Sequence, residues 1–288
     1  MTQPQIKSVQ CLSPVGLHNM VYKEWGDPKN PKVLVCVHGV TRVSDDFDNL
    51  AAALCDEYRV VCPDIVGRGR SDWLRDPMHY VISQYLSDMV TLLARLDVET
   101  VDWVGTSMGG LIAIPFAAMP GNPIRKLVLN DVGPALDMTS LVTIADYIGH
   151  DLRWPTYDDA ETYVRAISVP FGPHTDDEWQ RLAKSVLRQL EDGQWTRHYD
   201  LRLAKPFRHA YFDDVIGSES TLWQQYDAIT CPTLLLRGAQ SGLLMAKTAQ
   251  DMAQRGPRAR VVELEGVGHA PTLMHEDQIA IVKDFLLD

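Results

Sequence analysis

Runs of consecutive apolar residues recur along the chain, and most are separated by segments whose apolar residues return every three or four positions. A continuous apolar run is typical of a strand buried on both faces of a parallel sheet, whereas the spacing of three to four predicts an amphipathic helix. This alternation predicts an α/β fold with a mostly parallel central sheet and helices on both faces. The predicted strands span residues 33–37, 60–62, 100–104, 126–130, 233–237 and 260–264, and the predicted helices span residues 46–55, 81–96, 108–119, 248–254 and 275–287.

Two segments depart from this alternation. Near the N-terminus, residues 6–11 and 19–25 predict two strands joined through Gly16, which indicates an antiparallel hairpin at the sheet edge. After Asn130 the strand pattern lapses until Thr233, and helical spacing is found instead. The helices predicted there span residues 141–148, 157–167, 178–190 and 220–226. We therefore expect three parts, which are a first core part at residues 1–133, a helical insertion at 134–226 and a second core part at 227–288.

Ser107 lies between two glycines, directly after the predicted strand at residues 100–104. In Gly105-Thr106-Ser107-Met108-Gly109 the serine would occupy a tight strand-to-helix turn, the arrangement of a nucleophile elbow. The glycines leave room while the backbone takes a strained conformation and exposes the hydroxyl. Taken alone, the same residues also fit a turn in which Ser107 only caps the next helix.

His269 ends a glycine-rich loop near the end of the chain. Because an imidazole titrates near neutral pH, His269 can take the proton of Ser107 and return it to a leaving group. His38 precedes the serine, so we expect a structural role in which its ring braces a loop through hydrogen bonds. Most other histidines, including His174, are expected at the surface.

The His-Gly pair at residues 38–39 is followed by a candidate oxyanion site. An attacked ester carbonyl becomes a tetrahedral oxyanion, which needs two preorganised N–H donors. We expect the backbone N–H groups of Val40 and Met108 to be these donors. With Ser107 as nucleophile and His269 as base, the chain would then carry the parts needed for acyl transfer.

Charge and composition exclude several classes of partner. The net charge of −11 and the pI near 5.2 argue against nucleic-acid and anionic-membrane surfaces. No stretch approaches the ~20 apolar residues of a membrane span, and the first residues lack a secretory-signal pattern. We therefore expect a cytoplasmic protein. The five cysteines show no zinc-ligand spacing, so we expect buried thiols and no metal site.

The loop after the predicted strand at residues 60–62 contains Gly67-Arg68-Gly69 and at first suggests a dinucleotide-binding fingerprint. The third glycine of that fingerprint is missing, and no apolar helix face follows. A P-loop is excluded because the chain has no Gly-Lys-Ser/Thr in this position. We expect no cofactor, and the expected partner is a small-molecule substrate with an apolar portion.

Together, the Gly-x-Ser-x-Gly turn, the His-Gly loop and the Gly-His loop stand in the order of the α/β-hydrolase family, which this chain resembles over essentially its whole length. The resemblance implies that residues 134–226 form a helical cap over the active site. Four of the seven tryptophans, together with other aromatic residues, lie in this insertion. We expect most of these aromatic residues to hold the cap in place and a minority to line an apolar pocket.

The resemblance also implies a carboxylate that orients His269, commonly in the loop after the strand at residues 233–237. Residues 238–244 contain no carboxylate, and an aspartate would be expected where Ser241 or Gly242 stands. Some family members, notably haloalkane dehalogenases, carry the acid after the strand that corresponds here to residues 126–130, where this chain has Asp131. Asp131 is therefore the candidate acid, although it also fits a bracing role in a turn.

The predicted function is a serine hydrolase that cleaves a carboxylic ester, thioester or lactone with an apolar portion through an acyl-enzyme on Ser107. An alternative is a carbon–carbon bond hydrolase of vinylogous diketones, in which Arg42 would hold a substrate carboxylate. An exposed structural arginine is the favoured interpretation of Arg42. A non-catalytic ligand-binding protein is the third hypothesis, motivated by the carboxylate-free loop. No particular oligomeric state is predicted.

Overall fold

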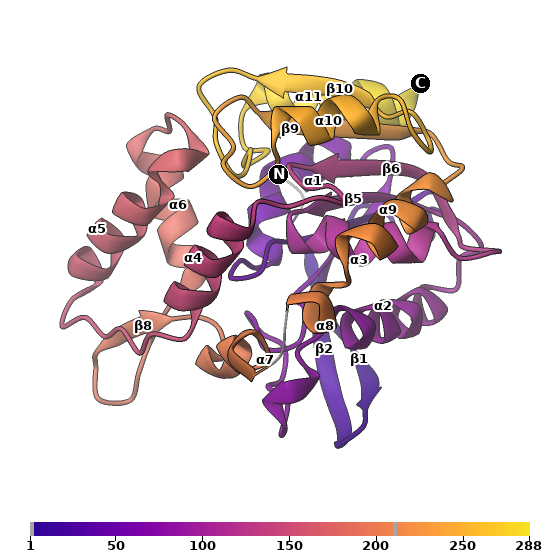
Figure 1. Cartoon of the computed structure of the whole chain (residues 1–288). Coiled ribbons are helices and arrows are strands. Elements are labelled where there is room, and N and C mark those ends of the chain that lie inside the picture. Colours follow the sequence, from indigo (N-terminus) through magenta and orange to yellow (C-terminus); the bar gives the residue numbers. More distant parts are fainter. Residues whose placement is uncertain (1–2, 210–211) are drawn as a thin grey trace.

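The computed structural model describes residues 3–209 and 212–288, and within them eight strands form one sheet in the order β1-β2-β4-β3-β5-β6-β9-β10 (Figure 1). The six strands from β4 to β10 in this order are parallel, and β2 pairs antiparallel with both β1 and β4. The predicted mostly parallel sheet with an antiparallel edge hairpin is confirmed. The strands span Gln5–Ser13 (β1), Gly16–Trp25 (β2), Val33–Val37 (β3), Arg59–Pro63 (β4), Val101–Thr106 (β5), Ile124–Asn130 (β6), Thr233–Gly238 (β9) and Arg260–Leu264 (β10).

Helices cover both faces of the sheet because successive side chains of each strand point to opposite faces. Along β3, Val33, Val35 and Val37 belong to one apolar cluster, whereas Leu34 and Cys36 belong to another. Helices α2, α3, α9 and α10 contribute to the first cluster, and α1 and α11 contribute to the second. These helices span Asp48–Leu54 (α1), Ile82–Leu96 (α2), Met108–Ala117 (α3), Glu219–Asp227 (α9), Ala246–Met252 (α10) and Glu276–Leu287 (α11).

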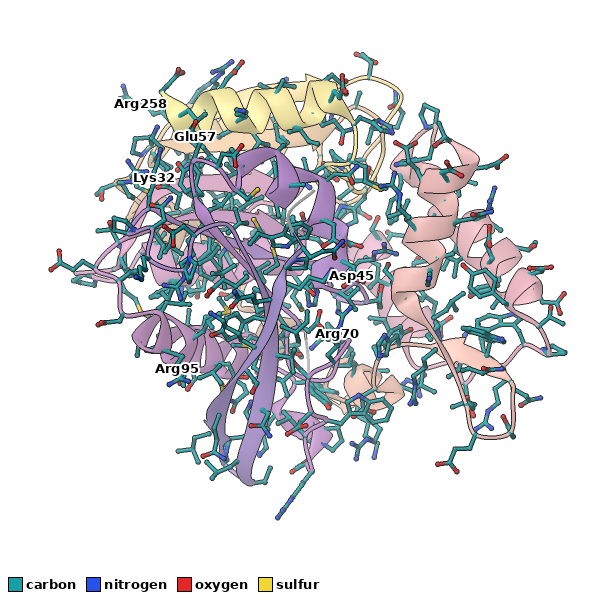
Figure 2. The ribbon with its side chains drawn as sticks, turned by 180° about the vertical axis from the view of Figure 1, so that it is seen from behind. Lys32, Asp45, Glu57, Arg70, Arg95 and Arg258 are labelled. Carbon is teal, nitrogen blue, oxygen red and sulfur yellow. The ribbon has the colours of Figure 1, made fainter. Side chains whose placement is uncertain are left out.

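Two loops at the carboxyl ends of the central strands are joined by ion pairs. The 3-10 helix η1 (Ser44–Phe47) follows β3, and its Asp45 lies beside Arg70 of the loop after β4 (Figure 2). The guanidinium of Arg70 donates to Asp45 at 2.8 Å and to Asp64 at 3.3 Å. Lys23 of β2 adds a fourth charged group, 2.9 Å from Asp45. These contacts hold the loops after β3 and β4 together.

Between β6 and β9 the chain leaves the sheet and forms a group of helices, of which α4, α5 and α6 lie to one side of it (Figure 1). These elements span Met138–Ile148 (α4), Tyr157–Ser168 (α5), Val169–Phe171 (η3), Asp176–Val186 (α6), Leu201–Leu203 (η4), Ala204–His209 (α7) and Phe212–Ile216 (α8). The sequence pattern did not predict α7 and α8, which are both shorter than two helical turns. Such short helices contain too few residues to show a period of 3.6.

The helix predicted at residues 178–190 is wrong at its C-terminal end. Helix α6 ends at Val186, and the next residues form β7 (Leu187–Gln189), which pairs antiparallel with β8 (Trp195–Arg197). The signal for this ribbon is Asp192-Gly193, because an Asp-Gly pair favours a hairpin turn. Gly193 has a φ of +84°, which few other residues adopt. The turn therefore overrides the helical spacing.

Aromatic residues hold this part of the chain together, as predicted for most of them. The ring of Trp154 lies 5.0 Å from that of Tyr163, and Tyr157 meets Trp195 edge-on at 5.1 Å. The backbones of Trp154 and Trp195 also exchange two hydrogen bonds of 2.9 and 2.8 Å. Among the residues that the structure describes, no helix is long and apolar enough to cross a membrane.

Candidate active site

Ser107 occupies a strained turn between β5 and α3. Its φ of 51° and ψ of −114° are unfavourable for a residue with a side chain. A Cβ atom on Gly105 would lie 2.5 Å from the backbone of Gly109, and one on Gly109 would lie 2.0 Å from the carbonyl oxygen of Val37. Both glycines are therefore required for helix α3 to approach the sheet this closely. The result is the strand-to-helix elbow that the sequence predicts around Ser107.

The structure brings Ser107, His269 and Asp131 together in one hydrogen-bonded chain. The Nε2 atom of His269 lies 2.9 Å from Oγ of Ser107, and its Nδ1 atom lies 2.8 Å from Oδ2 of Asp131. A carboxylate only accepts hydrogen bonds, so Nδ1 carries the proton and Nε2 is free to accept from the serine hydroxyl. The side chain of Asp131 is fully buried, whereas that of His269 is 21% exposed.

Asp131 follows β6 and is held by the loop that follows β9. Its Oδ1 atom accepts a hydrogen bond of 3.0 Å from the backbone N–H of Gly238, and its Oδ2 atom accepts one of 2.6 Å from the hydroxyl of Ser241. Ser241 is one of the two positions, together with Gly242, at which the family resemblance implies an aspartate. The loop thus supplies hydrogen-bond donors to a carboxylate on the neighbouring strand. Asp131 both faces His269 and braces this loop, so the two interpretations of Asp131 are compatible.

The residues predicted to donate to the oxyanion both lie near Ser107. Val40 lines the cavity next to the serine, and Met108 begins helix α3 immediately after it. Among the hydrogen bonds of the described residues, neither the N–H of Val40 nor that of Met108 is a donor. Two N–H groups without a protein acceptor are therefore available near Ser107.

Arg68, whose sequence pattern indicates only an incomplete cofactor motif, connects both of these residues. Its Nε atom donates to the carbonyl oxygen of Val40 at 2.8 Å, and its Nη2 atom lies 3.4 Å from the sulfur of Met108. Its Nη1 atom donates to Val66 and to the hydroxyl of Tyr85. Arg68 is 1% exposed. The sequence signal for such a role is an arginine flanked by two glycines in a loop beside the oxyanion segment.

His38 braces the same region, as predicted. Its Nδ1 atom donates to the carbonyl oxygen of Gly39 at 2.7 Å, and its Nε2 atom accepts from the backbone N–H of Ile65 at 3.0 Å. The ring is fully buried. Burial lowers the pKa of His38 to about 4, although Asp64 acts in the opposite direction. The ring is therefore neutral at pH 7, as its acceptor role at Nε2 requires.

A cavity of about 660 Å³ lies between the sheet and the helical segment. Ser107 and His269 line it together with many apolar side chains, which favours a ligand with an apolar portion. None of the four tryptophans of the segment appears in the lining among the residues described. The aromatic residues that line the cavity are Phe47, Tyr147, Tyr163, Phe171 and Tyr199.

Arg42 lines the cavity but is already paired. Its Nε and Nη2 atoms donate to the two carboxylate oxygens of Asp46 at 2.8 and 2.6 Å. The side chain of Arg42 is only 12% exposed, so the expectation of an exposed arginine is wrong, because the residue is covered in the cavity wall. The bidentate pair with Asp46 occupies the Nε/Nη2 edge of the guanidinium and neutralises its charge.

Two hydrogen bonds connect the helical segment to the loop of His269. The backbone N–H of Gly268 donates to the carbonyl oxygen of Pro170 at 2.6 Å. The Nε2 atom of His174 lies 2.9 Å from the hydroxyl of Thr272, and its Nδ1 atom lies 2.9 Å from the carbonyl oxygen of Gly172. His174 is half-buried and bonded through both ring nitrogens, so the expectation of an ordinary surface histidine is wrong.

One group of potential metal ligands occurs in the described part of the chain, and it lies outside the cavity lining. It consists of Cys11, His18 and Asp88, which are all buried. The Nε2 atom of His18 lies 2.9 Å from Oδ2 of Asp88, and the other carboxylate oxygen accepts from Gln84 at 2.8 Å. Both oxygens of this carboxylate therefore already have a hydrogen-bond partner in the protein.

Comparison with known proteins places the chain among hydrolases. A family model described as alpha/beta hydrolase fold matches residues 32–275. A 3-hydroxybutyrate-oligomer hydrolase from Cupriavidus necator is 50% identical over 285 residues, which cover 98% of this chain and 97% of that protein. An alpha/beta hydrolase structure from Novosphingobium aromaticivorans aligns with a TM-score of 0.88 and 34% identity over 100% of this chain and 99% of that one. A putative hydrolase from Rickettsia typhi aligns with a TM-score of 0.89 and 30% identity over 98% and 99%.

Proposed function

Because this chain belongs to the α/β-hydrolase fold family and is a carboxylic ester hydrolase, we propose that it cleaves short oligomers of 3-hydroxybutyrate. In this proposal Ser107 is the nucleophile, His269 the general base and acid, and Asp131 the residue that orients His269. The observation that carries the proposal is the hydrogen-bonded chain from Ser107 to Asp131 at the wall of a partly apolar cavity. The substrate is inferred from the similar protein of Cupriavidus necator.

Acylation begins when Oγ of Ser107 attacks the carbonyl carbon of an ester bond and its proton passes to Nε2 of His269. The carbonyl oxygen becomes an oxyanion, which accepts hydrogen bonds from the backbone N–H groups of Val40 and Met108. The carbon–oxygen bond to the alcohol then breaks, and the imidazolium gives its proton to the leaving oxygen. A 3-hydroxybutyryl ester of Ser107 and a shortened oligomer with a free hydroxyl result.

Deacylation repeats these steps with water as the nucleophile. His269 takes a proton from the water, the oxyanion forms again, and the bond to Oγ of Ser107 breaks with return of the proton to the serine. The product is 3-hydroxybutyrate. Asp131 keeps the proton on Nδ1 of His269 and stabilises the imidazolium, which forms in both halves of the reaction.

The cavity is suited to such a substrate. Its volume of about 660 Å³ lies within the range of roughly 300–1,000 Å³ that is usual for small-molecule sites. The methyl and methylene groups of an oligomer would contact apolar side chains of the wall, such as Ile144, Val164 and Leu243. The ester and hydroxyl oxygens would meet hydroxyl groups of the same wall, among them Thr143 and Ser168.

Two alternatives have less support. The carbon–carbon hydrolase needed Arg42 to hold a substrate carboxylate, but Asp46 already binds that guanidinium. The non-catalytic protein was motivated by the missing carboxylate at residues 238–244, and Asp131 supplies a carboxylate at the Nδ1 atom of His269. Both observations favour ester hydrolysis.

The test is hydrolysis of the 3-hydroxybutyrate dimer and trimer, followed by chromatography of the released monomer, with p-nitrophenyl butyrate as a neutral ester. We expect the wild type to cleave all three and Ser107→Ala to lose activity on all three. Ser83→Ala, which changes an exposed serine of α2, is the matched control and should behave like the wild type. Cleavage of p-nitrophenyl butyrate without any cleavage of the oligomers would refute the proposed substrate and leave the esterase intact.

A further inference from the structure

Arg197 is a buried cation in the wall of the active-site cavity. It is the last residue of β8, it is 4% exposed, and it lines the same cavity as Ser107 and His269. In the part of the chain that the structure describes, no carboxylate lies within 4.0 Å of its guanidinium. Arg42, in the same wall, differs in this respect because Asp46 neutralises it.

Arg197 donates hydrogen bonds only to neutral groups, and one of its three side-chain nitrogen atoms has no acceptor among the described residues. Its Nη1 atom donates to the carbonyl oxygen of Tyr147 at 3.1 Å, and its Nη2 atom donates to that of His150. Its Nε atom is buried without an acceptor among the described residues. The ring of Tyr199 lies 5.0 Å from the guanidinium carbon. Carbonyl oxygens and a ring face stabilise the cation, but none of them cancels its charge.

The charge balance of the cavity follows from these contacts. Apart from His269, its charged lining residues among those described are Arg42, Asp46 and Arg197. Since the first two cancel, one positive charge is left in the wall, within a protein whose net charge is −11. A buried charge without a partner is strongly unfavourable, and an anion that enters the cavity would relieve this penalty. Arginine suits a carboxylate because its planar guanidinium can donate two parallel hydrogen bonds.

We propose that Arg197 binds the free carboxylate at the end of the substrate and thereby selects acidic esters over neutral ones. The identity of the ester rests on the function proposed above. A 3-hydroxybutyrate oligomer ends in a carboxylate that belongs to the alcohol side of its last ester bond. With this carboxylate at Arg197, the chain extends along the cavity towards Ser107. Arg197 is thus a specificity-determining residue and takes no part in proton transfer.

The decisive comparison is the 3-hydroxybutyrate dimer as a free acid against its methyl ester, which has the same scissile bond and no charge. For Arg197→Gln we expect kcat/KM on the acid to fall about 10- to 100-fold, as for the loss of a charge-assisted hydrogen bond. We expect the rate on the methyl ester to change less than about threefold, because only the carboxylate contact is lost. Arg197→Lys keeps the charge and should recover part of the loss, mainly through KM.

Arg165→Gln is the matched control, since Arg165 lies on α5, outside the lining, and pairs with Glu161 and Asp176. It should leave both rates unchanged. Arg197 also binds carbonyl oxygens at the end of α4, so a purely structural role would lower both rates equally and lower the melting temperature. Equal losses on acid and ester overturn the proposal.

Inhibition experiments test the carboxylate site at Arg197 independently of the proposed oligomer substrate. Butyrate should inhibit the hydrolysis of p-nitrophenyl butyrate by the wild type competitively, butyramide should not, and Arg197→Gln should be insensitive to butyrate. This pattern supports the carboxylate site even if no oligomer is cleaved. Should Arg197→Gln fail to fold, the comparison of butyrate with butyramide on the wild type still decides, and equal inhibition by the two overturns the proposal.

Discussion

At the scale of single residues, the negative charge that faces His269 comes from an unexpected strand. Asp131 follows β6, whereas the family resemblance implies an acid after β9, where Ser241 stands. Because β6 and β9 are parallel neighbours, their carboxyl ends meet at the same edge of the sheet. A side chain from either strand therefore reaches the Nδ1 atom of His269, and the hydroxyl of Ser241 serves as a donor to the displaced carboxylate.

Asp131→Asn should lower kcat on p-nitrophenyl butyrate by about 10⁴-fold, as the exchange of this acid for an amide does in a serine protease. The amide cannot hold the proton on Nδ1 of His269 in the way a carboxylate does. Steady-state kinetics and the melting temperature provide the measurement. Ser241→Ala removes one donor to Asp131 but keeps the charge, and it should reduce kcat far less. A variant Asp131→Asn with nearly full activity would contradict the assigned role.

His38 should make the fold less stable in mild acid. Its pKa is about 4 in the folded chain and about 6.5 in the unfolded chain, because burial disfavours the charged ring. Between about pH 4 and about pH 6.5 only the unfolded state binds the proton. Neutral His38 therefore leaves the free energy of unfolding at its full value above about pH 6.5, and this free energy falls as the pH falls towards 4. Asp64 and Asp46 oppose this shift and Arg68 strengthens it.

Urea unfolding at pH 7 and pH 5 measures this effect. We expect a lower free energy of unfolding at pH 5 for the wild type, and a smaller decrease for His38→Asn, which cannot titrate. An equal decrease in both proteins would show that other groups dominate.

At the scale of elements, the loop after β4 supports the loop after β3. Arg68 donates to the carbonyl oxygen of Val40, which belongs to the peptide directly after the predicted oxyanion donor and so holds Val40 in place. Because a buried guanidinium with several acceptors is fixed in one position, it can hold a loop that has no regular structure of its own. We therefore expect a positioning role for the segment that at first suggests a dinucleotide-binding fingerprint.

Arg68→Met should lower kcat about 100-fold, the effect of losing one oxyanion donor, with a smaller change in KM. The matched control is Arg95→Met, because Arg95 is exposed on α2 and lies outside the cavity lining. Kinetics on p-nitrophenyl butyrate and thermal unfolding distinguish the two effects. A change in melting temperature without a change in kcat would refute the positioning role.

Elements with a strong local signal were predicted well, and the short strands within the helical segment were not. The six core strands and helix α3 follow from continuous apolar runs and from the glycines around Ser107. The ribbon of β7 and β8 was missed because the Asp192-Gly193 turn competes with helical spacing in the same residues. Arg197 belongs to this ribbon, so a residue of the cavity wall was missed with it.

At the scale of the whole molecule, the position of the helical segment over the sheet limits what reaches Ser107. The cavity walls come from the core and from the helical segment. Hydrogen bonds at Pro170, which accepts from Gly268, and at His174 join the segment to the loop of His269. A cavity bordered by both the sheet and the helical segment admits small ligands and excludes the surface of a solid. The exact boundaries of the three parts, like the cytoplasmic location, stay predictions.

Soluble oligomers should therefore be cleaved and solid poly(3-hydroxybutyrate) should not. We expect release of monomer from the dimer, trimer and tetramer, and no measurable release from polymer particles at the same enzyme concentration. The cavity of about 660 Å³ has no room for a chain held in a solid surface. Comparable rates on particles and oligomers would mean that the helical segment opens far more widely than its contacts indicate.

The sequence by itself determined the features that are encoded locally. Apolar runs and helical spacing determine the layers of the fold, and glycines beside Ser107 and His269 mark the two turns that carry them. The tertiary structure alone decided that Asp131 faces His269, that Arg68 holds Val40, and that Arg197 reaches the carbonyl oxygen of Tyr147 in the cavity wall. Each of these contacts joins residues that are distant in the chain, and such contacts depend on which strands become neighbours, which the periodicity of single segments does not encode.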